Sequence, residues 1–432
     1  NARYGVHSMR ENGCEARVKV LLVGSGGREH ALGWKLTQSS RVDELISLPG
    51  NPGLALLGPV VEGVNPLDVG AVAALARIHA VDLVVIGPEA PLAAGLADAV
   101  SALGIPVFGP RRAAARLEAS KAFAKDVMRR AGVPTAEAWT FTDRHAAHEH
   151  IGDRVGPHVI KADGLAAGKG VLVSDDDEAA HAWVDRCFDG GFGEAGATVV
   201  IEEYLSGPEV SVFAICSGTD AVALAPARDY KRLYDGDLGP NTGGMGSYSP
   251  VDDLPPRLVS DTVEDVIRPT LLQLDSDGHP YTGFLYAGLI LTDEGPRVLE
   301  FNVRLGDPET QVVLPRLESD LVDMIEAALA GSVVEPEWSP RAAVEVVLAA
   351  EGYPDSPISG TAIRGLDRVP EDVLVFHAGT AREGEKTVTA GGRVVNVVGL
   401  GPTRAEARER AYAGAERIRW PGMQYRADIA AD

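Results

Sequence analysis

The hydrophobic pattern of the first hundred residues alternates between short apolar runs and helical spacing. Glycine-containing turns close three runs that predict β-strands: residues 18–24, 82–86 and 105–108. A helix is predicted over Glu29–Thr37, soon after the first run. Strands that alternate with helices predict a parallel α/β layer domain over residues 18–118. Ligands bind such sheets beyond the carboxyl ends of the strands, where the turns at Gly24 and at residues 87–89 lie.

The pattern of the middle and last parts is different. Helical spacing predicts one amphipathic helix over about 113–130, with stop signals at Gly132 and Pro134. The β runs HVIKAD and GVLVS flank the segment GLAAGK and predict a hairpin with a mobile tip. Five later runs predict one antiparallel sheet with connecting helices: TVVIEEYL, EVSVFAIC, AVALAP, YAGLILT and RVLEFNV. A β-rich tail follows residue 335 and ends in a helix near 404–417.

The chain length predicts several domains. At roughly 150 residues per domain, 432 residues correspond to about three domains. We therefore predict a multidomain α/β and α+β fold. Its predicted divisions are an artificial or disordered extension over residues 1–17, an N-terminal α/β substrate domain over 18–118, a central region over 119–335 with a lid over about 133–203, and a C-terminal β-rich domain over 336–428.

Composition narrows the class of partner. The formal charge is −22, from 40 Lys and Arg against 62 Asp and Glu, which disfavours nucleic acid and anionic membranes because both need a basic surface. No apolar run approaches the roughly 20 residues of a transmembrane helix. The cysteines Cys14, Cys187 and Cys216 are isolated, so we expect a reducing cytoplasm. We also expect a monomer that acts on small molecules.

The first candidate motif is GSGGREH, residues 24–30. A dinucleotide fingerprint needs glycine at its sixth place, but Glu29 stands there, and a carboxylate would sit close to the pyrophosphate. The plain alternative is a tight strand-to-helix turn. The functional interpretation adds a small anion or a substrate held by backbone N–H groups at the helix N-terminus.

The second motif is KADGLAAGKG, residues 161–170. Its glycines allow close approach of the backbone to phosphate oxygens, and Lys161 and Lys169 can neutralise charge there. It is not a Walker loop, because Gly170 and Val171 replace the Lys-Ser/Thr end. A flexible hairpin tip with solvated lysines is the alternative.

The third motif is VVIEEYLSGPEVSV, in which a β run ends at residues 202–205 and resumes at Glu209. A crossover between domains can offer backbone groups to an adenine edge, and Glu209 could then accept ribose hydroxyls. An ordinary acidic strand end is the alternative.

The fourth motif is LEFNVRLGDPETQ, residues 299–311. Alternate side chains of a strand share a face, so Glu300, Asn302 and Arg304 should point one way and Leu299, Phe301 and Val303 the other. A carboxylate and an amide oxygen two residues apart suit Mg²⁺. Arg304 can hold a substrate carboxylate with two parallel N–H groups. Exposed polar residues on a sheet face are the alternative.

Together and in this order, the motifs resemble those of the ATP-grasp ligases. Within that superfamily the strings VIKADGLAAGKGV, DYKRLYDGDLGPNTGGMGSYSP and EFNVRLGDPETQ resemble the phosphoribosylamine–glycine ligase family, over about residues 18–426. The resemblance implies a central ATP-grasp fold with a small lid. It also implies ATP-dependent joining of glycine to 5-phosphoribosylamine through glycyl phosphate, in purine synthesis.

The resemblance also assigns roles to residues of this chain. The implied ATP-binding residues are Lys121, Lys161, Gly168, Lys169, Gly170, Glu202, Glu203, Tyr204, Leu205 and Glu209. The implied substrate-binding residues are Gly26, Gly27, Arg28, Glu29, Glu89, Asp229, Lys231 and Arg304, of which Arg304 is the catalytic candidate. Glu300 and Asn302 are the implied ligands of Mg²⁺ or Mn²⁺. The chain departs from many ATP-grasp enzymes at Gly288, where an acidic metal ligand is expected, so any second metal's ligands stay open.

Three other classes remain possible from the sequence. Another ATP-grasp enzyme, such as an aminoimidazole ribonucleotide carboxylation enzyme or a biotin carboxylase, would share the ATP core but respond to bicarbonate. A nicotinamide oxidoreductase would bind its cofactor at the Gly24 turn. A nucleotide-binding regulator would release no ADP.

Overall fold

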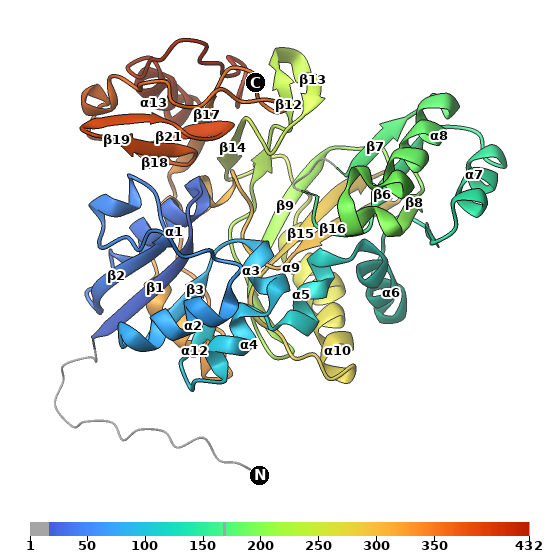
Figure 1. Cartoon of the computed structure of the whole chain (residues 1–432), viewed down its shortest axis with the longest axis horizontal. Coiled ribbons are helices and arrows are strands. Elements are labelled where there is room, and N and C mark those ends of the chain that lie inside the picture. Colours follow the sequence, from blue (N-terminus) through green and yellow to red (C-terminus); the bar gives the residue numbers. More distant parts are fainter. Residues whose placement is uncertain (1–16, 167–169, 432) are drawn as a thin grey trace.

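The computed structural model describes residues 17–166 and 170–431. The predicted extension, apart from Arg17, and the predicted hairpin tip at residues 167–169 therefore lie outside the described residues. Within the described chain the predicted multidomain α/β and α+β architecture is confirmed (Figure 1).

The N-terminal sheet is parallel, in the order β2-β1-β3-β4. Its strands are β1 Val18–Gly24, β2 Val42–Pro49, β3 Leu83–Ile86 and β4 Val107–Phe108, and its helices are α1 Gly27–Leu36, α2 Val69–Ile78, α3 Glu89–Ala94 and α4 Leu96–Ser101. β1 is an almost continuous buried run, as expected for an inner parallel strand covered on both faces. β2 was not predicted, because Asp43 and Glu44 interrupt the apolar pattern at its start and only residues 45–48 form a buried run.

The single helix predicted over 113–130 is wrong, because two helices occupy this segment. They are α5 Arg112–Ala119 and α6 Lys121–Ala131. Ser120 between them has extended backbone, and its hydroxyl accepts the Phe123 N–H as the cap of α6. Asp163 accepts the Ser120 hydroxyl and the Ala122 N–H, each at 3.1 Å. Continuous helical spacing hides this break, because its stabilising partner comes from a distant part of the chain.

A small lobe (residues 138–202) stands out on one side of the molecule (Figure 1). Its antiparallel sheet has the order β5-β8-β6-β7. The elements are β5 Ala138–Phe141, α7 Arg144–Gly152, β6 His158–Ala162, β7 Val171–Ser174, α8 Asp177–Arg186 and β8 Val199–Glu202. It has its own hydrophobic core, which includes Ile151, Ile160 and Val184. The run TVVIEEYL was predicted in the central sheet but forms β8 here, because strand pairing is not encoded in the local pattern.

The central sheet is antiparallel, in the order β10-β9-β15-β16. Its strands are β9 Glu209–Ser217, β10 Asp220–Ala223, β15 Thr282–Thr292 and β16 Gly295–Asn302, and the helices of this region are α9 Leu258–Thr262, α10 Arg268–Ser276, α11 Thr310–Val313 and α12 Leu321–Leu329. Apart from TVVIEEYL, the runs predicted for this sheet do form it.

The C-terminal sheet has the order β11-β14-β17-β21-β18. Its strands are β11 Arg228–Asp229, β14 Gly246–Ser249, β17 Ala342–Ala349, β18 Val373–His377 and β21 Arg393–Gly401. Two hairpins, β12 Arg232–Tyr234 with β13 Leu238–Asn241 and β19 Thr380–Glu383 with β20 Lys386–Thr389, and helix α13 Arg404–Ala415 complete this part. β11 and β14 precede residue 335, so this sheet draws strands from both sides of the predicted boundary.

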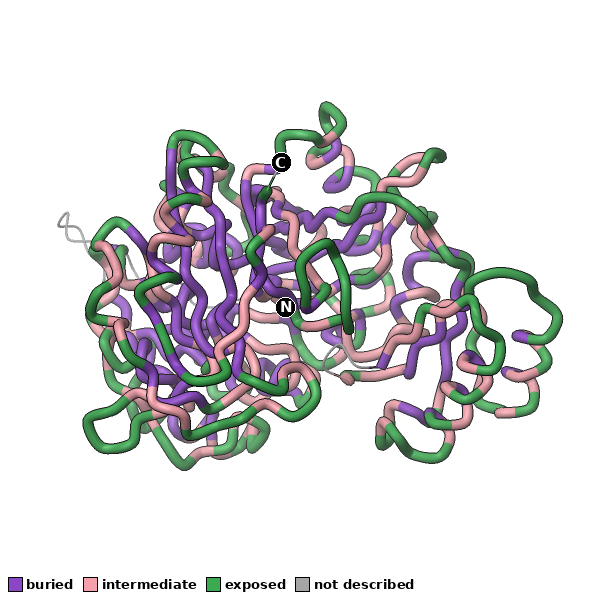
Figure 2. The backbone as a smooth tube through the Cα atoms, turned by 90° about the horizontal axis from the view of Figure 1, so that it is seen from above, coloured by how far each residue is buried: buried purple, intermediate pink, exposed green. Residues whose placement is uncertain are grey.

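One hydrophobic core joins the N-terminal, central and C-terminal sheets. It contains Leu22 of β1, Phe213 of β9, Leu305 after β16, and Val398 of β21. Figure 2 shows buried segments of the backbone in the interior, with exposed segments around them. The polar residues between the sheets are therefore held on a common framework. Among the described helices none is long and apolar enough to cross a membrane.

Candidate active site

Strand β16 carries the predicted metal ligands. Glu300 is exposed and Asn302 half-buried, while Phe301 between them is buried, as strand alternation requires. Asn302 Nδ2 donates to Glu300 Oε1 at 3.4 Å, so the amide and the carboxylate are neighbours. The predicted alternation fails at Leu299, which is half-buried, because the register with β15 shifts there and forms a bulge.

Arg304 lies just beyond the end of β16 and does not continue the strand. Its Nη2 donates to Glu118 Oε1 at 2.7 Å, its Nε to Glu89 Oε2 at 3.2 Å, and its Nη1 to the Leu305 carbonyl at 3.3 Å. Arg28 Nη1 approaches Glu89 at 3.9 Å. The predicted substrate residues Arg28, Glu89 and Arg304 therefore meet. Glu118 was missed, although it stands three residues before the predicted Lys121.

The two glutamates of this cluster have pKa values shifted in opposite directions. Burial alone would raise the pKa of Glu89, but Arg304 and Arg28 lower it to about 2. Burial raises the pKa of Glu118 to about 7, against the opposing charge of Arg304 and with a further contribution from Glu89. Burial disfavours the charged form of Arg304, yet Glu118 and Glu89 raise its pKa above the ordinary value. The guanidinium therefore stays charged, while Glu118 titrates near neutrality.

Two lysines hold the buried carboxylate of Glu202. Lys161 approaches Glu202 Oε1 at 2.9 Å and Lys125 approaches Oε2 at 3.0 Å. Burial would raise the pKa of Glu202, but these lysines lower it. Lys161 Nζ also lies 3.5 Å from the Leu299 carbonyl, which joins the small lobe to β16. No role was predicted for Lys125 from the sequence, although it lies on the same helix as Lys121.

Lys121 opens helix α6 and reaches the root of the glycine-rich loop. Its Nζ donates to the Gly164 carbonyl at 2.9 Å. Burial lowers the pKa of Lys121, Glu300 acts in the opposite direction, and Lys161 adds to the lowering. Lys121, Lys161 and Glu300 therefore lie close enough for their charges to interact. Gly170 lies beside Ala166 at the other end of the loop, whereas the predicted Gly168 and Lys169 lie outside the described residues.

The predicted adenine segment follows β8. Glu203 and Tyr204 are exposed and Leu205 is half-buried. A hollow of about 230 Å³ borders this turn, lined by Trp139, Arg154, Val155, Gly156, Pro157, His158, Ile201, Glu202, Glu203 and Tyr204. The segment is therefore accessible where the small lobe joins the central sheet.

The Gly24 turn is packed around Glu29. The Glu29 carboxylate accepts the Gly26 N–H and the Arg28 Nε–H, each at 2.6 Å. A β-carbon at Gly87 would lie 2.3 Å from Glu29 Oε1, which explains the need for glycine there. A glutamate three residues after a helix cap is a capping-box signal that the sequence already contains. One backbone donor of this turn is thus satisfied by Glu29 itself.

A second polar group lies between β9, β11 and the GDPETQ segment. Lys231 pairs with Asp229 and with Glu209, each at 2.7 Å, so a predicted ATP residue meets two predicted substrate residues. The buried Glu309 accepts the Ser211 hydroxyl at 2.8 Å. Burial, and then the charge of Asp229, raise the pKa of Glu309 to about 7. No role was predicted for Glu309 from the sequence, although it follows β16 closely.

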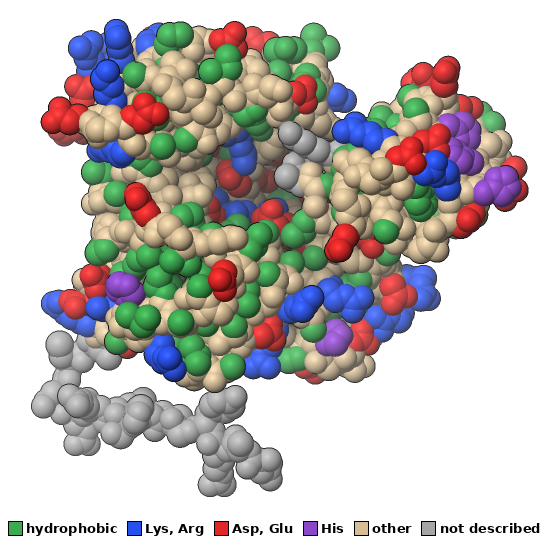
Figure 3. Space-filling view, in the orientation of Figure 1, with side chains coloured by type: hydrophobic (Ala, Val, Ile, Leu, Met, Phe, Trp, Pro, Cys, Tyr) green, Lys and Arg blue, Asp and Glu red, His purple; other side chains and the backbone are tan. Residues whose placement is uncertain are grey.

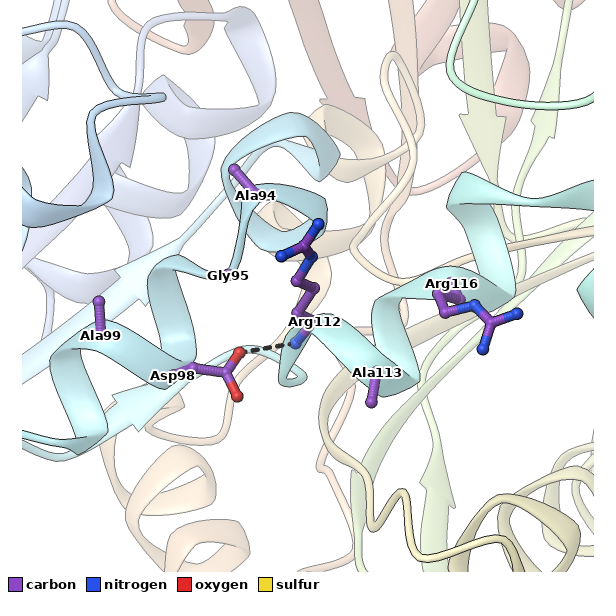
Figure 4. Close-up of a pocket in the computed structure, with 7 residues that line it drawn as sticks. All are labelled: Ala94, Gly95, Asp98, Ala99, Arg112, Ala113 and Arg116. Carbon is purple, nitrogen blue, oxygen red and sulfur yellow. Dashed lines mark hydrogen bonds between the residues drawn. The ribbon is translucent and has the colours of Figure 1, made fainter. Parts of the chain in front are cut away.

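Figure 3 shows a central hollow that contains both basic and acidic side chains. A different hollow, of about 620 Å³, lies over α3, α4 and α5 and is lined by Ala94, Gly95, Asp98, Ala99, Arg112, Ala113 and Arg116. Asp98 accepts the Arg112 N–H there at 2.8 Å (Figure 4). It shares no lining residue with the groups described above.

A small antiparallel lobe that meets a larger antiparallel sheet, with lysine and carboxylate side chains between them, defines the ATP-grasp class of ligases. Three family profiles match the chain: the phosphoribosylglycinamide synthetase N domain over residues 18–118, the ATP-grasp (A) domain over 119–310 and the C domain over 343–432. The chain belongs to the phosphoribosylglycinamide synthetase family, as its motifs predicted.

Curated relatives and solved structures agree with this membership. A phosphoribosylamine–glycine ligase of Caulobacter vibrioides is 50% identical over 418 residues, covering 96% of this chain and 98% of the relative. That of Rhizobium meliloti is 49% identical over 414 residues, covering 95% and 98%. The crystal structure of phosphoribosylamine–glycine ligase from Thermotoga maritima superposes with a TM-score of 0.85 at 39% identity, covering 95% of this chain and all of the other. A biotin carboxylase from Campylobacter jejuni, with a TM-score of 0.73 and 15% identity over 94% of this chain and 93% of the other, shares the fold alone.

Proposed function

We propose that this protein joins glycine to 5-phosphoribosylamine at the expense of ATP, which is cleaved by phosphoryl transfer to glycine, giving glycinamide ribonucleotide, ADP and phosphate. The observation that carries the proposal is the match to all three family domains, together with 49–50% identity to ligases of that name over nearly the whole chain. The reaction forms a C–N bond and belongs to de novo purine biosynthesis, towards inosine monophosphate. We further propose a cytoplasmic monomer whose partners are small molecules.

The chemistry needs two displacement steps. A glycine carboxylate oxygen attacks the γ-phosphorus of ATP, the bond from that phosphorus to the ADP oxygen breaks, and glycyl phosphate forms. The amine of phosphoribosylamine then attacks the carbonyl carbon, the carbon–oxygen bond to phosphate breaks, and the amine loses a proton. Catalysis of the first step consists mainly of positioning and charge stabilisation, so no enzyme nucleophile is required.

The phosphates of ATP would lie against Lys121 and Lys161. Both amines come from the joint between the small lobe and β16, and their partners are the Gly164 carbonyl and Glu202. The neighbouring turn, with Glu203, Tyr204 and Leu205, would frame adenine, and Glu209 would accept ribose hydroxyls. Gly168, Lys169 and Gly170 are further proposed phosphate contacts, of which Gly168 and Lys169 lie outside the described residues.

The donor set of β16 fits a divalent cation. Glu300 supplies an exposed carboxylate and the neighbouring Asn302 an amide group, and carboxylate and amide oxygens are ligands that suit Mg²⁺. We propose Mg²⁺, or Mn²⁺ in its place. When bound there, the cation would neutralise negative charge on the phosphates.

Arg304 would hold the glycine carboxylate. A guanidinium has five N–H donors. Glu89, Glu118 and the Leu305 carbonyl use three of them among the described residues, which leaves one on Nη1 and one on Nη2. These two can contact both oxygens of a carboxylate. Gly26, Gly27, Arg28, Glu29, Glu89, Asp229 and Lys231 would surround phosphoribosylamine.

The direct test is ADP release with a panel of amino acids, with and without freshly made phosphoribosylamine. We expect release to require glycine and phosphoribosylamine together. Bicarbonate-stimulated release without glycine would instead indicate a carboxylase. Absence of ADP release, with a nicotinamide cofactor bound in a fluorescence titration, would overturn the ligase assignment.

A further inference from the structure

Glu118 occupies the next-to-last position of α5 and belongs to none of the four sequence motifs. Its side chain is only 7% exposed. Within its carboxylate, Oε2 accepts the Val303 N–H at 2.7 Å and Oε1 accepts Arg304 Nη2 at 2.7 Å. One carboxylate thus contacts two consecutive residues just after the metal strand.

These contacts fix how the chain leaves β16. The ladder with β15 ends at the pair of Tyr286 and Asn302, so Val303 is the first residue beyond it. Glu118 supplies the acceptor for the Val303 N–H at that point. The same carboxylate turns the Arg304 guanidinium toward α5, away from the line of the strand. The position of Arg304 relative to Glu300 and Asn302 therefore depends on Glu118.

The segment that carries Glu118 also carries Lys121. The break at Ser120 places Lys121 at the start of α6, where its Nζ contacts the Gly164 carbonyl at 2.9 Å. Asp163 holds this break through Ser120 and Ala122. The junction of α5 and α6 thus connects a phosphate-side lysine with the guanidinium.

Glu89 cannot replace Glu118 in this role. Its contact to Arg304 is longer, at 3.2 Å, and its carboxylate also faces Arg28 at 3.9 Å. Its side chain is 27% exposed, against 7% for Glu118. Glu89 therefore balances charge for two arginines, while Glu118 has the shorter, more buried contact.

We propose that Glu118 is a positioning residue that aims the free N–H groups of Arg304 at the substrate carboxylate, at a fixed separation from Lys121. The inference rests on the proposed function, because Arg304 must hold that carboxylate. Glu118 itself touches no substrate in this role.

The test compares Glu118→Gln with the wild-type protein. The glutamine has nearly the same size and retains one oxygen for the Val303 N–H, but its NH₂ group cannot accept from Arg304. We expect the KM for glycine to rise about tenfold or more, as for loss of a charge-assisted hydrogen bond, while the KM for ATP stays within about twofold. Glu62→Gln, at an exposed glutamate, is the matched control and should change neither value.

A double variant tests whether Glu118 acts through Arg304. If it does, adding Glu118→Gln to Arg304→Lys should change the glycine KM much less than it does in the wild-type background. Additive effects, equal rises in both KM values, or an unchanged glycine KM would overturn the inference alone. Failure of the wild-type protein to use glycine would overturn the proposed function and the inference with it. Thermal melting of each variant establishes that it is folded.

Discussion

At the residue scale, buried charges in this protein are organised in small groups with both signs. Glu202 lies between Lys161 and Lys125, and Arg304 between Glu89 and Glu118. A buried charge without a partner is strongly unfavourable, so each group fixes the side chains that it contains. The groups that would meet ATP and glycine are thereby oriented before any ligand arrives.

Replacing Arg304 by alanine tests the glycine site directly. The change removes the two N–H groups proposed for the glycine carboxylate, so the glycine KM should rise at least about 100-fold or turnover should disappear. ATP binding, measured by calorimetry, should remain largely intact. Normal turnover at low glycine would contradict the proposed role.

The Glu300→Gln variant tests the metal site. Because the amide lacks the carboxylate charge, the Mg²⁺ concentration for half-maximal ADP release should rise about tenfold or more. Binding of Mn²⁺ in the presence of a non-hydrolysable ATP analogue, followed by paramagnetic resonance, should weaken in parallel. Glu294→Gln lies on the same hairpin and is exposed, so it serves as the control. An unchanged metal requirement would exclude Glu300 as a ligand.

At the element scale, helix starts and strand ends carry the site. α1, α3 and α6 begin at residues 27, 89 and 121, and β16 ends just before Arg304. At such ends the backbone hydrogen-bond pattern stops, so side chains and backbone groups there can contact groups from other elements. The close packing of α1 against β21 is the clearest case. A β-carbon at Gly27 would lie 1.8 Å from Asn396 Nδ2 and 2.9 Å from Gln311 Nε2.

Gly27→Ala should therefore displace Asn396 and loosen the contact between α1 and β21. We expect a loss of roughly 1–3 kcal/mol in the free energy of unfolding, typical of overpacking, and a higher KM for phosphoribosylamine. Urea denaturation and initial rates measure the two effects. Gly70→Ala, in the first turn of α2, places its methyl group 3.6 Å from Asp68 and should have little effect. Partial rescue by Asn396→Ala would identify the clash as the cause.

At the scale of the whole molecule, the N-terminal, central and C-terminal sheets share one core, and polar contacts join the first and last parts of the chain. His30 of α1 accepts the His377 N–H of β18 through Nδ1 at 2.8 Å, and Asn51 donates to the His377 carbonyl at 2.8 Å. Burial lowers the pKa of His30 to about 3 and that of His377 to about 4. The contact between the first and last parts of the chain therefore requires a neutral His30, whose Nδ1 is the acceptor.

This contact predicts a loss of stability in acid. An unfolded histidine gains a proton below its ordinary pKa of 6.5, whereas buried His30 does not until about pH 3. The contribution of His30 to the free energy of unfolding is therefore fully present above pH 6.5. It falls as the pH drops toward 3, by about 1.4 kcal/mol per pH unit for one such group. His30→Asn keeps an acceptor and should lose about 1.4 kcal/mol less than the wild type between pH 7.5 and 5.5 in urea denaturation. His145→Asn, at an exposed position, should behave as the wild type.

The motifs that identify the site were all visible in the sequence, yet several of its residues were not. Glu300 and Asn302 could be proposed as metal ligands because two-residue spacing places side chains on one face of a strand. Glu118 was missed because it belongs to none of the four motifs, although Lys121 is close by, and its partner Arg304 is 186 residues away. The break at Ser120 was missed for the same reason, since Asp163 is 43 residues away.

The sequence by itself determined the family, the chemical types of the site residues, and most strands and helices, because glycine turns, apolar periodicity and motif spacing are properties of neighbouring residues. Only the tertiary structure decided which charges meet, how β8 joins the small lobe, and how β11 and β14 join the last sheet. These outcomes depend on packing between segments far apart along the chain. Arg304 illustrates the division: its type and place were readable locally, whereas its contact with Glu89 spans 215 residues.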